Sequence, residues 1–222
     1  MQLILQSALN LFLPQENVCH LCGRWADQEI LCEKCLQEMA AQRLPGNRQT
    51  RYAHWGVRVV VSCWNHESVP RKLVHLLKYR SDPRAAVFLA QGMTAALLNE
   101  AKVLKKSRLI VPIPLHPLRE KERGYNQAEL LAREISAAVG LPVRHDLLFR
   151  TRQTGVLARM HYNERKNAVC GAFAVSNAKE IRGRSILLVD DVYTTGATSN
   201  ACAEALYQAG AQAVYLITAC RA

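Results

Sequence analysis

Apolar and polar residues along 57–222 follow patterns that fit strands and helices in turn. Short apolar runs rich in β-branched residues predict strands over 57–64, 109–114, 172–175, 186–190 and 213–218. Apolar positions that repeat every three or four residues predict helices over 69–79, 85–101, 126–139 and 197–208. This alternation predicts an α/β fold in which a parallel sheet is flanked by helices.

The first 50 residues follow a different pattern, and we expect residues 1–50 and 51–222 to form two units. Apolar residues on one helix face predict a short N-terminal helix that docks on the body: Ile4, Ala8, Leu11 and Phe12. A small module follows over 14–40, and the polar stretch 42–54 predicts a linker. A second polar stretch, 150–167, predicts a long loop in the larger domain.

Charge adds a functional hint to this picture. No apolar run approaches the ~20 residues that span a bilayer, and the N-terminus lacks the basic region and cleavage site of a signal peptide. We therefore expect no membrane span and a cytoplasmic protein. The chain has a net charge of +11, and because residues 1–50 hold four basic and five acidic residues, residues 51–222 hold +12. This surplus suits anionic partners such as phosphorylated metabolites, nucleic acid or a membrane surface, although it also serves general solubility.

The eight cysteines fall into two sets. Four of them form two pairs with two residues inside each pair: Cys19, Cys22, Cys32 and Cys35. Two such turns aim four thiolates at one ion and predict a closed, structural Zn²⁺ site, with Gly23 where a positive φ is favoured. Disulfides, a redox pair or an iron–sulfur cluster are weaker interpretations, and His20 and His54 are possible substitute ligands. We expect the remaining cysteines to be reduced and buried: Cys63, Cys170, Cys202 and Cys220.

The most specific pattern is ILLVDDVYTTGAT at 186–198. Asp190 and Asp191 end a buried strand, at the edge where open α/β sheets bind ligands. A loop then leads into a helix whose amides and dipole suit a phosphate: Thr194, Thr195, Gly196, Ala197 and Thr198. Carboxylates for sugar hydroxyls beside a phosphate pocket describe a site for a ribose 5-phosphate. A plain solvated strand end is the weaker interpretation.

This stretch resembles the signature of type I phosphoribosyltransferases, and the wider pattern resembles the competence protein ComF/GntX family. The resemblance covers the four-cysteine ribbon, VPIPLHPLREKERGYNQAELLA at 111–132, RTRQT at 150–154, CGAF at 170–173 and residues 186–198. RGYNQ at 123–127 is the family's RGFNQ with Tyr125 for phenylalanine. Leu157 and Ala168 replace the family's usual glutamine and asparagine.

The resemblance implies that 5-phosphoribosyl-1-pyrophosphate (PRPP) binds with Mg²⁺ on residues 190–198, where Asp190 and Asp191 hold the ribose and stabilise charge on the ring. It implies a pyrophosphate site made by the loop after the 109–114 strand and by nearby arginines: Leu115, His116, Arg119, Arg123, Arg150 and Arg152. Arginines suit this work because they offer forked, always-charged donors. For His116, a turn or packing role is the stronger interpretation.

Three function classes fit these features. The first is a transferase, for example in nucleotide salvage, whose acceptor no motif names. The second, implied by the resemblance, is a protein of natural competence that works on internalised single-stranded DNA with a helicase partner. For that role we expect a basic face on the larger domain: Arg71, Lys72, Lys78, Lys105 and Lys106. The third is a PRPP-sensing regulator without catalysis.

Overall fold

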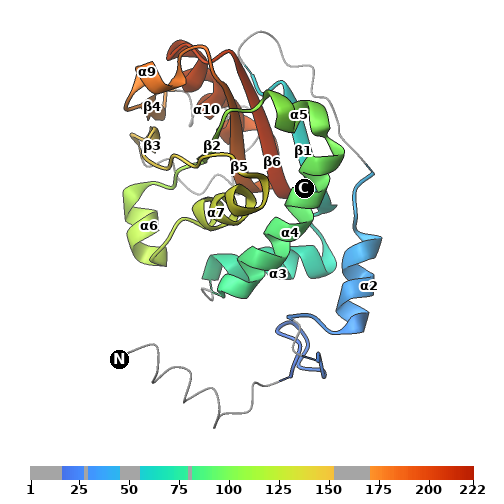
Figure 1. Ribbon diagram of the computed structural model, residues 1–222. Helices are drawn as coiled ribbons and strands as arrows, with labels where there is room; N and C mark the ends of the chain where they lie inside the picture. The colour runs from blue at the N-terminus through green and yellow to red at the C-terminus, as the bar shows by residue number, and fades with distance from the viewer. Residues whose placement is uncertain (1–16, 28–29, 46–55, 80–81, 153–170) are drawn as a thin grey trace, which may run out of the picture.

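The computed structural model describes residues 17–27, 30–45, 56–79, 82–152 and 171–222 (Figure 1). Its central sheet has four parallel strands, in the order β1 (Val59–Asn65), β6 (Ala213–Arg221), β5 (Ser185–Tyr193) and β2 (Leu109–Pro112). Helices lie on both sides of this sheet (Figure 1). The predicted α/β fold with a parallel sheet flanked by helices is confirmed.

Two apolar clusters hold helices to the two faces of the sheet. On one face α4 (Pro83–Asn99) and α7 (Gln127–Val139) bury residues such as Leu89 and Leu131 against the strands. On the other face lie α10 (Ala197–Gln208) and a two-stranded antiparallel sheet of β3 (Leu148–Arg150) and β4 (Phe173–Val175). Because both faces are covered, the strands are nearly continuous apolar runs.

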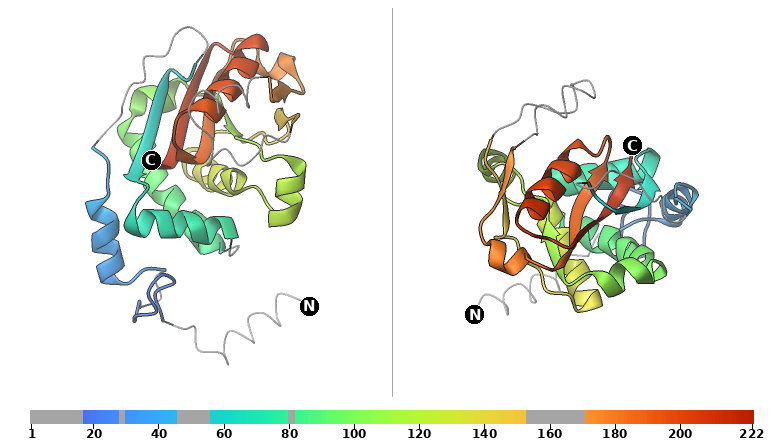
Figure 2. Two further views of the ribbon diagram at one scale, coloured as in Figure 1. Left: turned by 180° about the vertical axis from the view of Figure 1, so that it is seen from behind. Right: turned by 90° about the horizontal axis from the view of Figure 1, so that it is seen from above.

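A further helix, α3 (Ser68–Tyr79), lies at the carboxyl ends of the strands (Figures 1 and 2). It follows β1 directly, and its buried residues Leu73 and Leu77 join the cluster formed with α4. Parallel sheets bind ligands at their carboxyl edge. The position of α3 therefore makes it a cover for the edge at which the predicted site lies.

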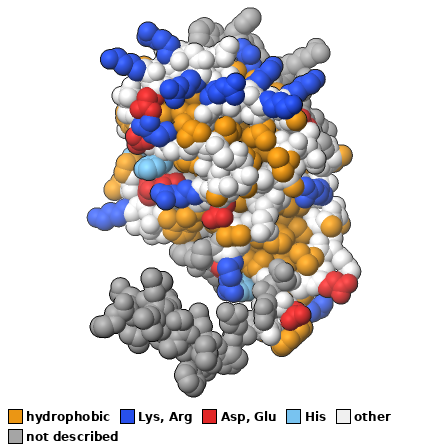
Figure 3. Space-filling view, viewed as in Figure 1, with side chains coloured by type: hydrophobic (Ala, Val, Ile, Leu, Met, Phe, Trp, Pro, Cys, Tyr) orange, Lys and Arg blue, Asp and Glu red, His pale blue; other side chains and the backbone are white. Residues whose placement is uncertain are grey.

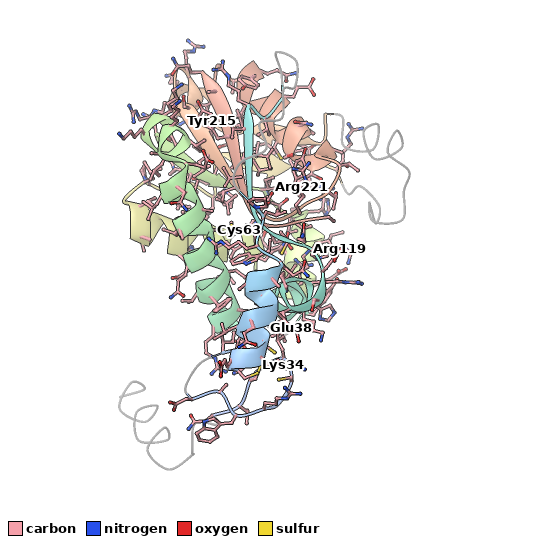
Figure 4. All side chains as sticks on the ribbon, turned by 90° about the vertical axis from the view of Figure 1, so that its right-hand side faces the viewer. Lys34, Glu38, Cys63, Arg119, Tyr215 and Arg221 are labelled. Atoms are coloured by element: carbon pink, nitrogen blue, oxygen red, sulfur yellow. The ribbon has the colours of Figure 1, made fainter. Side chains whose placement is uncertain are left out.

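The cysteine module docks on α3 through its helix α2 (Glu33–Ala41). Figure 4 shows Glu38 on α2, and its carboxylate accepts from the Ser68 hydroxyl at 3.0 Å. Met39 of α2 shares the apolar cluster with α3. A second contact joins Nδ1 of His20 to Oδ2 of Asp82 at 2.5 Å. Asp82 also caps α4, so the module is fixed to the starts of two helices.

Several boundaries differ from the prediction. The helix predicted over 85–101 ends at Asn99, and a separate helix, α5 (Ala101–Lys106), follows it. Four of the described helices were not predicted: α2, α5, α6 (Pro117–Arg123) and α9 (Ala178–Ile181). α6 buries none of its side chains, so it has no apolar period to reveal it; Pro117 at its start and Gly124 at its end are its only local signals.

The predicted linker is wrong for its first residues. Residues 42–44 run antiparallel to the end of β1, since Leu44 N donates to Cys63 O and Asn65 N donates to Gln42 O, both at 2.9 Å. Residues 46–54 of that stretch lie outside the described residues, as do the predicted N-terminal helix and 153–167 of the predicted loop. Within the described ranges, no helix combines the length and the apolar character needed to span a bilayer.

Candidate functional site

The candidate site is built on the last residues of β5. This strand runs to Tyr193, three residues beyond its predicted end, and pairs with β6 throughout. Asp190 and Asp191 therefore belong to the sheet rather than to a loop. Oδ1 of Asp190 accepts from the Asp191 backbone N–H at 2.8 Å, and the Asp191 side chain is buried. The two carboxyl groups are fixed at the edge where ligands bind.

Lys78 is the unexpected partner of this pair. Its Nζ, in the last turn of α3, lies 2.5 Å from Oδ2 of Asp191. Burial raises the pKa of Asp191, but the charge of Lys78 and the hydrogen bonds from Asp190, Lys78 and Gln127 together outweigh that effect and leave the pKa below its usual value. Burial and the charge of Asp191 raise the pKa of Asp190 well above its usual value. Asp191 is therefore the carboxylate that stays ionised, and Asp190 is the one that takes up a proton first.

The predicted phosphate loop follows β5 and leads into α10. Gly196 precedes the helix with a positive φ of 78°, and the Thr195 hydroxyl accepts from the Ala197 N–H at 3.4 Å. A small hollow at this turn is lined by residues that include most of the predicted set: Asp190, Thr194, Gly196, Ala197 and Thr198. Helix N-terminal amides at such a turn suit an anionic group. The structure thus brings these predicted residues together.

Residues 123–127 join several elements at the same edge. Tyr125 donates its hydroxyl to the backbone of the last turn of α3. Asn126 caps α7 and donates to the carbonyl that follows β2. Gln127 accepts from Arg123 and forms a hydrogen bond with Asp191. The tyrosine at position 125 thus makes a contact with α3 that a phenylalanine could not.

The residues predicted for pyrophosphate fall into two groups. Arg119 and Arg123 on α6 line a hollow of about 260 Å³ together with Lys78 and Tyr79 of α3. The Arg123 guanidinium lies 5.7 Å from the centroid of the Tyr79 ring. Leu115 and His116 lie in the connection before α6, and Nδ1 of His116 accepts from the Leu118 N–H at 3.3 Å. This contact agrees with a turn role for His116.

Arg150 and Arg152 lie elsewhere. Arg150 stands at the end of β3, with its guanidinium 5.5 Å from the centroid of the Phe173 ring, on the α10 side of the sheet. It is near enough to Asp190 for their charges to interact. Arg152 is exposed beside Gly171. Neither arginine lines the hollow beside α6. Leu157 and Ala168 lie outside the described residues.

The four cysteines of the module form a second candidate site. Their sulfur atoms all lie within 4.8 Å of one another, with Cys22 and Cys32 at 3.5 Å and Cys19 and Cys35 at 3.7 Å. Such a cluster can hold a metal ion such as zinc. Gly23 has the expected positive φ, 70°. His20 pairs with Asp82, which makes it a docking residue rather than a fifth ligand; His54 lies outside the described residues.

The remaining cysteines within the described ranges behave as predicted. Cys63, Cys202 and Cys220 are free and buried. Cys170 lies outside the described residues.

The predicted basic face is not one face. Arg71, Lys72 and Lys78 belong to α3 at the carboxyl edge, and Lys78 is engaged with Asp191. Lys105 and Lys106 end α5 just before β2, and so lie at the opposite, amino edge. Figure 3 shows lysine and arginine side chains gathered at the upper end of the molecule, where Figure 1 places α5 and α9. Exposed basic residues at this edge are Lys105, Lys106, Arg108, Arg182 and Arg184.

Three site residues escaped sequence reasoning: Lys78, Tyr79 and Gln127. Lys78 was visible only as one of several basic residues on a helix, and no local spacing places α3 against β5. Gln127 lies inside the RGYNQ segment, whose similarity to a family motif was the one signal that could have identified it.

Comparisons with known proteins show what this chain is similar to. Residues 93–222 match the family model described as "Phosphoribosyl transferase domain". The chain is 27% identical over 211 residues to "Competence protein F" of Haemophilus influenzae, covering 92% of this chain and 90% of that protein. It is 28% identical over 215 residues to "DNA utilization protein YhgH" of Escherichia coli K12, covering 95% and 93%. It is 29% identical over 198 residues to "Competence protein ComFC" of Bacillus subtilis, covering 87% and 73%. The resemblance to the ComF family is confirmed.

Proposed function

The chain belongs to the phosphoribosyl transferase domain family, and from that membership we propose that it binds PRPP at the carboxyl end of β5. The observation that carries the proposal is a buried carboxylate, Asp191, paired with Lys78 a few residues before the glycine turn at Gly196. Asp190 and Asp191 would hold the ribose, and residues 194–198 would hold the 5-phosphate. Calorimetric titration with PRPP and Mg²⁺ tests this assignment. Folded wild-type protein is expected to release or absorb heat as PRPP binds, and no heat of binding would contradict the proposal.

Mg²⁺ would enter with the ligand. Asp191 already has the ammonium of Lys78 as its partner. This arrangement favours an ion held by oxygens of PRPP and by water, which is how Mg²⁺ is often bound in phosphate sites.

Turnover requires that positive charge on the ribose ring be stabilised as pyrophosphate leaves. The ionised Asp191 is suited to that work, and this supports a transferase. The test is pyrophosphate release from PRPP with Mg²⁺, measured alone and with nucleobases or single-stranded DNA. Release that disappears in Asp191→Asn supports a transferase. Binding of PRPP without release supports a PRPP-sensing regulator.

The names of the relatives, "Competence protein F", "Competence protein ComFC" and "DNA utilization protein YhgH", favour a role in natural competence and DNA use. We propose single-stranded DNA and a competence helicase as its partners in this role. The basic amino edge is the better DNA surface, since Lys105 and Lys106 are exposed there and are not engaged at the PRPP edge. DNA and PRPP would then bind at opposite edges of one sheet.

The cysteine cluster completes the proposal as a structural Zn²⁺ site in a unit of residues 1–50, beside a PRPP-binding domain of residues 51–222. Four thiolates form a closed shell, and the module has little core of its own, so the metal would supply much of its stability. The free thiols of Cys63, Cys202 and Cys220 suit a reducing compartment, which supports a cytoplasmic protein.

A further inference from the structure

We propose that Lys78, which lines the hollow between α3 and α6, is a further ligand-binding residue that contacts the pyrophosphate group of PRPP and so selects PRPP over ribose 5-phosphate. The inference rests on the proposed function. It adds Lys78, which lies outside the segments that resemble the family, and assigns it a role in ligand specificity.

The charge of the hollow is the first support. Its lining includes three cations, Lys78, Arg119 and Arg123, and one acid, Glu122. Glu122 contacts Arg119 at 3.4 Å, and both side chains are largely exposed. An exposed pair of this kind is weak, and the Arg123 guanidinium is placed by Gln127 and Tyr79. The hollow therefore has a surplus of positive charge, which suits a group with several negative charges.

The position of Lys78 is the second support. Its side chain lines the hollow and also contacts Asp191, at the ribose end of the candidate site. An ammonium group has three donors, so it can hold a carboxylate and a phosphate oxygen together. In PRPP the pyrophosphate is attached directly to the ribose. The Lys78 ammonium lies between the Asp191 carboxylate, proposed to hold the ribose, and the hollow, so it can contact both parts of one PRPP molecule.

The fixed placement of α3 is the third support. The Tyr125 hydroxyl donates to the carbonyl of Leu77, the residue before Lys78. At the other end of the helix, Ser68 donates to Glu38 of the cysteine module. The helix that carries Lys78 is therefore held at both ends, and its ammonium is aimed before a ligand arrives.

The test is calorimetry with PRPP, ribose 5-phosphate and inorganic pyrophosphate, each with Mg²⁺, on wild type, Lys78→Met and Lys72→Met. Lys72 is an exposed cation of the same helix and controls for net charge. Lys78→Met should lose about tenfold or more in affinity for PRPP and pyrophosphate, as expected for a lost charged hydrogen bond, and keep its affinity for ribose 5-phosphate. Lys72→Met should match wild type for all three ligands.

If Lys78→Met loses affinity for PRPP and for ribose 5-phosphate by the same factor, Lys78 does not select between the two ligands. The proposal that wild type binds PRPP would be unaffected by that result. A wild-type protein that binds no PRPP would overturn the proposed function and this inference together. If Lys78→Met does not fold, Lys78→Met with Asp191→Asn removes the unpaired buried charge. That double variant should then bind pyrophosphate about tenfold more weakly than Asp191→Asn alone, and equal affinity would reject the inference.

Discussion

A Cβ atom on Gly196 would lie 2.7 Å from the hydroxyl oxygen of Tyr193. Real Cβ contacts are longer, and Tyr193 is buried with the Arg221 guanidinium 5.4 Å from its ring centroid, so the phenol has little room to move. The residue also has a φ of 78°, which disfavours any side chain. Two independent constraints therefore require glycine in the loop proposed to hold the 5-phosphate.

The first prediction concerns this glycine. Gly196→Ala should lower the free energy of unfolding by about 2–4 kcal/mol, because left-handed strain and an overpacked contact add, and it should abolish PRPP binding. Gly183→Ala is the matched control: its φ is 70°, but nothing lies within 4 Å of an added Cβ. It should lose only the strain, about 1–2 kcal/mol, as measured by urea unfolding. Equal losses in the two variants would show that the Tyr193 contact is unimportant.

The second prediction is the pH dependence of the Lys78 ion pair. Lys78 lowers the pKa of Asp191, so the stability that it adds is present above the usual carboxyl pKa and is lost as pH falls through the folded value. The gap in unfolding free energy between wild type and Lys78→Met should be large at pH ~7 and shrink as the pH falls toward the lowered folded pKa of Asp191, because in Lys78→Met burial acts without the charge of Lys78 and the Asp191 carboxyl accepts a proton at a higher pH than in wild type. Urea titrations across this range measure it, with Lys72→Met as control. A gap that stays constant with pH would contradict the assignment.

The third prediction concerns metal. Purified protein should carry about one Zn²⁺ per chain, since four thiolates close one shell. Cys22→Ser should lose metal and solubility together, whereas Cys63→Ser, a buried thiol outside the cluster, should keep its metal. Elemental analysis by mass spectrometry measures both. Full metal content in a variant that lacks both Cys19 and Cys22 would exclude the site.

The fourth prediction concerns DNA. If the amino edge binds phosphates, affinity for single strands should fall steeply with salt and depend little on sequence. Replacing Lys105 and Lys106 together with glutamine should flatten the salt slope, and the same change at Arg71 and Lys72, on the opposite edge, should not. Fluorescence anisotropy at several salt concentrations measures the slopes. Binding that ignores ionic strength, or equal slopes for the two double variants, would count against this surface.

Sequence patterns predicted those structural features that depend on residues close together in the chain. The apolar strands, the cysteine pairs and the glycine turn before α10 each depend on residues close together in sequence. The end of β5 was predicted three residues too early, at Asp190, because the polar residues that follow give no sign that the strand goes on pairing with β6 to Tyr193. α6 was not predicted because it buries none of its side chains and its sequence therefore shows no apolar period.

The contact between Lys78 and Asp191 joins residues 113 positions apart. No spacing within the sequence encodes it, because it depends on how α3 is held against the carboxyl edge. Tyr125, which differs from the family's usual phenylalanine, supplies one of the contacts that hold α3 there. The basic residues show the same limit, since a count of charges cannot assign Lys78 to one edge and Lys105 to the other.

The central claim is that PRPP binds with Mg²⁺ on β5 and the loop that follows it. Calorimetry with wild type and with Asp190→Asn plus Asp191→Asn tests it most directly. Wild type should give saturable heat with PRPP. The double variant should lose the stability of the Lys78 ion pair but remain folded, because both residues lie at the end of a strand and not in the apolar clusters. It should bind PRPP at least about tenfold more weakly, since charged hydrogen bonds to the ribose are lost. No detectable heat with folded wild type, or unchanged PRPP affinity in the double variant, would contradict the claim.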